Sequence, residues 1–115
     1  MREELRSALV AAMKARDLVA VSALRSALGA IDNAGAVDAA AAPAGGVSEH
    51  VAGGVAGLRA TEVTRRELTA AEARELVRAE VAERLAVAER HEAAGRAEPA
   101  ARLRAEAAAL QPFLT

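Results

Sequence analysis

Residues 68–95, LTAAEARELVRAEVAERLAVAERHEAAG, carry the clearest helical signal in the chain. Thr69 and Glu72 have the spacing of a capping box, in which the hydroxyl and the carboxylate satisfy backbone amides of the first turn. Gly95 can adopt the left-handed conformation that commonly follows a helix. We therefore predict a long helix from Thr69 to Gly95, with Thr69, Glu72 and Gly95 in structural roles. Apolar residues recur along one face of this helix: Leu76, Val77, Val81, Leu85 and Ala88.

A shorter helix is predicted directly after Gly95. Pro99 suits the first turn of a helix, where its missing amide costs no hydrogen bond. Pro112 marks the end of this helix. Because only a few residues connect the two helices, we expect them to pack antiparallel as a helical hairpin. The predicted buried face of the shorter helix consists of Leu103, Ala107 and Leu110.

The first part of the chain predicts a second hairpin. Residues 3–16 have an amphipathic pattern, and Asp17 has the side chain of a helix N-cap. The helix that begins there is expected to stop at Asn33 and Gly35. The close junction at Asp17 favours antiparallel packing of the two helices. The apolar stripe of the second helix follows spacings of three and four residues: Leu18, Val21, Leu24, Leu28 and Ile31.

The two hairpins are separated by a segment of different composition. From Ala34 to Gly57 the chain is rich in alanine and glycine and holds no lysine or arginine. Such a segment buries too little apolar surface to offset its ordering entropy. We therefore predict a flexible linker over residues 34–60 within a single all-α domain, residues 1–115, built from four main helices. The core is expected to consist mostly of Leu18, Val21, Leu24, Leu28, Leu76, Val77, Val81 and Leu85.

Composition sets limits on the function. Apolar residues make up 53% of the 115 residues, but 34 residues are alanine, so the core must be thin. The net charge of −1 gives no overall attraction to nucleic acid or to an anionic membrane. The absence of cysteine excludes disulfides, thiolate nucleophiles and cysteine-ligated zinc. With no signal peptide and no membrane-spanning stretch in the sequence, we expect a cytoplasmic protein without membrane contact.

The sequence offers no catalytic constellation, no metal site and no cofactor motif. His50 and His91 lack partners at metal-binding spacing, so solvated side chains are the better interpretation. The glycines of residues 53–57 have no following lysine that could hold a phosphate. Arg65 and Arg66 open the densest cationic cluster, but nearby glutamates neutralise it, which favours a salt-bridged surface over a phosphate site. We therefore predict no intrinsic enzymatic activity.

Several short motifs, in their order, resemble the GatB/YqeY family. These are Leu24-Arg25 in the second helix, Arg66-Glu67-Leu68-Thr69 at the capped helix start, and Ala94-Gly95-Arg96 at the turn. The ending from Glu106 to Leu114 is similar to the acidic residue, leucine and aromatic-leucine pattern of the family's fourth helix. The chain reads Phe113-Leu114-Thr115 where the family usually continues into a further small bundle, so the resemblance is to a short form without that bundle.

The resemblance implies a relation to the tail region of the B subunit of the aspartyl/glutamyl-tRNA amidotransferase, a region that contacts tRNA. The family label would be a carbon-nitrogen ligase with glutamine as amido-N-donor, yet the chemistry of that enzyme lies outside its tail. We therefore expect a non-catalytic module that binds tRNA or amidotransferase subunits, with Arg65, Arg66 and Arg96 as contact residues. The alternative is an interaction module that binds a copy of itself or another helical protein through its thin apolar stripes.

Overall fold

The computed structural model describes the backbone of residues 1–41 and 68–115, and the side chains of residues 1–36 and 68–115. This part of the chain is helical and contains no strand, which confirms the all-α fold class. Among the helices described, none has the length and apolar character needed to cross a lipid bilayer. The elements are α1 (Arg2–Ala15), α2 (Leu18–Ala41), α5 (Ala70–Ala93), α6 (Ala97–Leu110) and the short 3₁₀ helix η1 (Gln111–Leu114).

A tight turn joins α1 to α2. Arg16 adopts the left-handed conformation with φ 59°, and its backbone amide donates to the carbonyl of Met13 at 3.1 Å. The amide of Asp17 donates to the carbonyl of Ala12 at 2.9 Å. The carboxylate of Asp17 in turn accepts a hydrogen bond from the amide of Ala20 at 3.1 Å, which caps the start of α2. These bonds fold α2 back along α1.

The helix α5 begins with a complete capping box. The amide of Glu72 donates to the hydroxyl of Thr69 at 3.1 Å, and the amide of Thr69 donates to the carboxylate of Glu72 at 2.9 Å. Two otherwise unpaired backbone donors of the first turn are thereby satisfied. The helix therefore has a defined first residue.

A Schellman motif ends α5 and turns the chain into α6. Gly95 has φ 77°, and its amide donates to the carbonyl of Glu92 at 3.0 Å, while the amide of Arg96 reaches back to His91 at 2.8 Å. Pro99 lies in the first turn of α6, where its missing amide leaves no bond unmade. The result is a long α5–α6 hairpin.

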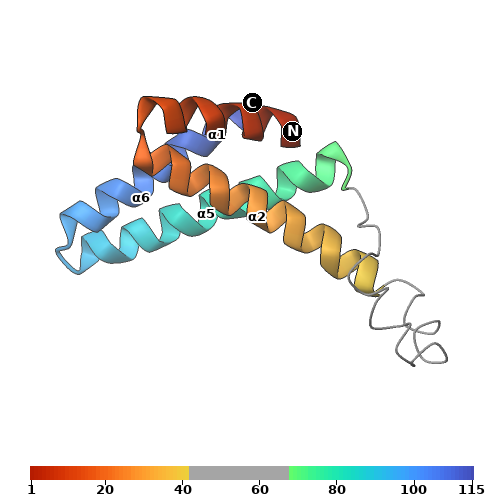
Figure 1. Cartoon of the computed structure of the whole chain (residues 1–115). Coiled ribbons are helices and arrows are strands. Elements are labelled where there is room, and N and C mark those ends of the chain that lie inside the picture. Colours follow the sequence, from red (N-terminus) through yellow and green to blue (C-terminus); the bar gives the residue numbers. More distant parts are fainter. Residues whose placement is uncertain (42–67) are drawn as a thin grey trace, which may run out of the picture.

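The two hairpins pack through α2, which lies across α5 and α6, while α1 lies along the outer side of α2 (Figure 1). The turn between α5 and α6 extends beyond the end of the α1–α2 hairpin (Figure 1). Leu5, Val77 and Leu110 are the largest fully buried side chains. Alanines fill much of the remaining space in the core between the hairpins, namely Ala12, Ala23, Ala27, Ala73 and Ala107.

The predicted end of the second helix was wrong. The helix α2 continues through Asn33 and Gly35 to Ala41, so the first eight residues of the predicted linker, 34–41, are helical. Five of these eight residues are alanine, the strongest helix former, and each interrupting residue costs about 1 kcal/mol or less. Gly35 is also buried, which favours a residue without a side chain. Residues 42–60 of the predicted linker lie outside the described part of the chain.

The predicted core was correct for half of its members. Val21, Leu24, Val77 and Val81 are buried, and Leu28 and Leu76 are half-buried against the core. Leu18 is 73% exposed and Leu85 is 39% exposed, so neither belongs to the core. Leu18 opens α2 directly after the turn, and at that point none of the described helices covers its outer side. Leu5 and Leu110, which are not among the eight predicted core residues, are fully buried.

Candidate functional site

A partly buried ionic cluster, with an exposed serine at its edge, joins α2, α5 and α6. We refer to Ser26, Glu80, Arg84 and Glu106 as the ionic cluster. The guanidinium of Arg84 donates from Nη1 to Glu80 Oε1 at 2.8 Å and from Nε to Glu106 Oε1 at 2.9 Å. The hydroxyl of Ser26 donates to the same oxygen of Glu80 at 2.7 Å. Arg84 thereby links α5 to α6, and Glu80 links α5 to α2 through Ser26.

The position of Arg84 in the helix explains this geometry. Glu80 lies one turn earlier on α5, at the four-residue spacing that brings side chains of a helix together. Glu106 projects from the facing side of α6. The side chains of Arg84 and Glu106 are only 12% and 10% exposed, respectively. A charged pair so far from water is retained only where each charge finds a hydrogen-bonding partner.

The charged side chains of the ionic cluster are paired with one another. Burial acts to lower the pKa of Arg84, but hydrogen bonds and charges of Glu80 and Glu106 outweigh that effect and raise its pKa above the ordinary value. Both carboxylates are engaged by the guanidinium, and Glu106 also meets Arg102 Nε at 3.5 Å. The cluster therefore holds helices together, and its geometry gives no reason to assign it acid–base chemistry.

Of the three arginines that were predicted to contact tRNA or a protein partner, the structure describes one. Arg96 is exposed at the N-cap of α6, at the outer end of the α5–α6 hairpin. Its backbone amide belongs to the Schellman motif, so the turn fixes the direction in which Arg96 leaves the backbone. Arg65 and Arg66 lie outside the described residues. Sequence reasoning found the caps and the turn because their signals are local.

An exposed apolar end lies at the turn between α1 and α2. We define the apolar end as Val10, Met13 and Leu18, whose exposed fractions are 51%, 50% and 73%. Val10 and Met13 are three residues apart and therefore share one face of α1. The sequence analysis assigned Leu18 to the apolar stripe of the second helix, which is not where the structure places it. Because the transfer of apolar side chains out of water lowers the free energy, this end can contribute to binding a partner.

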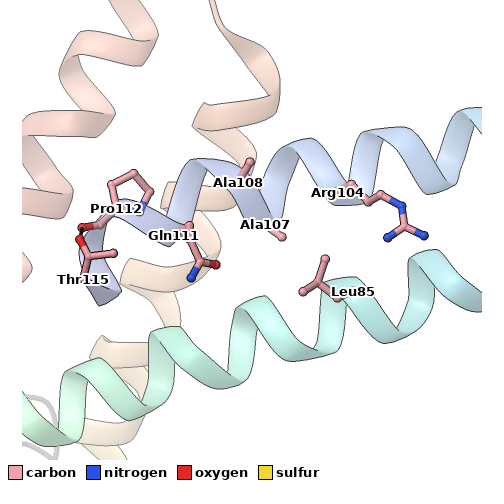
Figure 2. A pocket seen from close by; sticks show the side chains of 7 residues that line it. All are labelled: Leu85, Arg104, Ala107, Ala108, Gln111, Pro112 and Thr115. Atoms are coloured by element: carbon pink, nitrogen blue, oxygen red, sulfur yellow. Dashed lines mark hydrogen bonds between the residues drawn. The ribbon is translucent and has the colours of Figure 1, made fainter.

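A shallow groove of about 520 Å³ lies between α5 and the segment formed by α6 and η1 (Figure 2). Leu85 points toward the groove from α5, and Arg104 lies at one end of it (Figure 2). Arg104 is already paired, since its Nη2 lies 2.5 Å from Glu92 Oε1. The remaining lining is small or neutral and comes from one side: Ala107, Ala108, Gln111, Pro112 and Thr115.

The groove and the ionic cluster are separate features. None of the four cluster residues lines the groove. Within the residues that the structure describes, no group of three histidine or carboxylate side chains is placed to hold a metal ion. Comparison with protein-family models, with curated proteins and with solved structures gave no match.

Proposed function

We propose that this chain is a non-catalytic helical module that associates with tRNA or with the tRNA-dependent amidotransferase. The observation that carries the proposal is the construction of the α5–α6 hairpin. The residues that resemble the GatB/YqeY pattern around Thr69 and Gly95 form the capping box and the Schellman motif that delimit α5. The resemblance thus involves residues that determine the fold, which supports a shared architecture.

The proposed role is binding, and the carbon–nitrogen ligation that the family label names takes place elsewhere in the assembly. Several of the described polar residues are engaged in caps and ion pairs, such as those of Arg84 with Glu80 and Glu106. Arg96 is exposed at the outer end of the hairpin, where a partner can reach its side chain. A cytoplasmic setting is part of the proposal, since the chain contains no cysteine and needs no oxidising compartment.

Titration of the purified chain with tRNA at several salt concentrations tests this proposal. Each arginine–phosphate contact that is lost makes the slope of log affinity against log salt less steep by about 0.7 to 0.9. We expect Arg96→Ala, Arg65→Ala and Arg66→Ala each to flatten the slope. Arg6→Ala is the matched control, because Arg6 is an exposed arginine on α1 that pairs with Glu3. Equal slopes for all four variants would exclude these arginines as phosphate contacts.

A second candidate function is favoured by the apolar end. Val10, Met13 and Leu18 would be covered if the chain bound a copy of itself or another helical protein. Sedimentation of the purified chain measures self-association, and binding of a helical partner is measured by co-purification at high salt. Val10→Glu combined with Met13→Glu should abolish either association, whereas salt should not. Salt-sensitive binding that survives this double substitution would exclude the apolar end as the interface.

A further inference from the structure

The core between the two hairpins consists of aliphatic side chains, whose contacts are non-directional. Ala23 and Ala27 of α2 meet a surface to which α5 and α6 contribute Ala73 and Ala107. Apolar contact is non-directional, and a shift of α2 by one turn, about 5.4 Å, would again place aliphatic side chains against α5 and α6. The larger side chains at this interface are aliphatic and form no hydrogen bonds: Val21, Leu24, Ile31, Val77, Val81 and Leu110.

The connection between the hairpins does not fix the alignment either. A turn of a few residues sets the register of α5 against α6, and another sets α1 against α2. The helices α2 and α5, in contrast, are separated by residues 42–67 along the chain. A connection of this length does not by its length alone hold two helices in one register.

The ionic cluster is directional where the apolar interface is not. The hydrogen bond of 2.7 Å from Ser26 to Glu80 crosses from α2 to α5, and Glu80 is itself held by Arg84. A one-turn shift of α2 would carry Ser26 out of reach of Glu80. Arg84 is in turn anchored to α6 through Glu106, so the position of Glu80 is defined relative to both helices of the second hairpin.

We propose that the ionic cluster is a register lock that selects one alignment of the α1–α2 hairpin on the α5–α6 hairpin. Its contribution is specificity more than stability. Replacing an entire buried ion pair by apolar residues of similar size is often neutral or stabilising, whereas removing one partner is strongly destabilising. The apolar core drives the hairpins together, and the cluster determines where along its length α2 comes to rest.

Distance measurements between two spin labels test the lock. The chain contains no cysteine, so Asn33→Cys on α2 and Ala101→Cys on α6, both at exposed positions, provide unique labelling sites in the full chain. With the cluster intact we expect one narrow distance distribution. In the cluster-free variant Ser26→Ala/Glu80→Met/Arg84→Met/Glu106→Leu we expect retained helical content and a distribution that broadens or splits by about 5 Å.

Two further variants make the result specific. Glu75→Met/Arg78→Met removes an exposed ion pair from the same helix and should leave the distribution narrow. Glu80→Gln keeps an oxygen that can accept from Ser26 and should also keep one alignment. A single narrow distribution at the parental distance in the cluster-free variant would overturn the proposal. Loss of helical content in that variant would overturn it as well, because the apolar core would then not suffice to hold the hairpins.

Discussion

Arg84 on α5 and Glu106 on α6 form an ion pair at 2.9 Å in which both side chains are almost entirely withdrawn from water. Among the described residues, Glu106 is the charged residue that is buried, and its neighbours in the core are aliphatic. The energetics of the pair differ from those of the surface ion pairs of the same helices, because burial removes the screening that makes exposed pairs weak.

Breaking the buried pair on one side should destabilise the fold. Arg84→Met leaves the carboxylates of Glu80 and Glu106 without their shared cation, and we expect a loss of about 3 kcal/mol in the free energy of unfolding. Denaturation with urea, followed by far-ultraviolet circular dichroism, measures the change. Arg78→Met is the matched control, since Arg78 pairs with Glu75 at the surface, and its cost should stay below about 1 kcal/mol. Equal effects of the two substitutions would show that the burial of Arg84 carries no special weight.

Any residue with a side chain at position 95 should lower the free energy of unfolding. A Cβ at this position would meet no atom within 4 Å, so the cost of Gly95→Ala comes from the backbone conformation with φ 77°. We expect a loss of about 1 to 2 kcal/mol in the free energy of unfolding. Gly29→Ala is a suitable control, because Gly29 also has open space but lies inside α2, where alanine is preferred. An unchanged stability of Gly95→Ala would contradict the role assigned to the left-handed turn.

The turn at Arg16 presents the opposite case. Arg16 has φ 59°, a conformation that costs an ordinary residue free energy and that glycine adopts freely. Arg16→Gly should therefore raise the free energy of unfolding by about 0.5 kcal/mol, after the greater freedom of glycine in the unfolded chain is subtracted. Thermal unfolding of the variant checks the sign. A lower melting temperature would mean that the Arg16 side chain contributes more than its backbone costs.

The capping box at the start of α5 gives a further measurable effect. Thr69→Ala removes the hydroxyl that accepts from the amide of Glu72 and should cost about 1 kcal/mol. Thr69→Ser keeps an equivalent hydroxyl and should restore most of the stability. Amide hydrogen exchange in the first turn of α5 reports the loss locally. If Thr69→Ala left this exchange unchanged, residues other than Thr69 would define the helix start.

The proposal that the module is non-catalytic also has a direct consequence. The purified chain, supplied with glutamine, should release no ammonia above the rate of a buffer control. The measurement is a coupled ammonia assay over several hours at high protein concentration. Sustained release that scales with the amount of protein would contradict the assignment of the chemistry to other subunits.

Local signals allowed much of the fold to be predicted from the sequence. Helix starts at Asp17 and Thr69 and the turn at Gly95 depend on residues within one or two turns, so spacing alone identifies them. Burial of single apolar residues was harder to predict, because helical spacing shows that Leu18 and Leu85 lie on apolar faces but not whether another helix covers them. The four-residue spacing of Glu80 and Arg84 predicts their pairing, but the contacts of Ser26 and Glu106 were not predicted, since only tertiary packing brings these residues to the pair.

The end of α2 shows a different limitation. Asn33 and Gly35 are residues that often end helices, and the sequence analysis gave them that role. In this chain the surrounding alanines offset the cost, and the buried position of Gly35 suits a residue without a side chain. A stop signal is therefore decisive only when the residues that follow it are poor helix formers.

The measurement that tests the central claim most directly is a native pull-down of the tagged full chain from a lysate of its source cell, performed at low and at high salt. The bound fraction is divided, so that RNA is sequenced and proteins are identified by mass spectrometry. The proposed function predicts enrichment of tRNA or of amidotransferase subunits at low salt and loss of the tRNA at high salt. Recovery of only the chain itself or an unrelated helical protein, unaffected by salt, would contradict it and identify the chain as an interaction module.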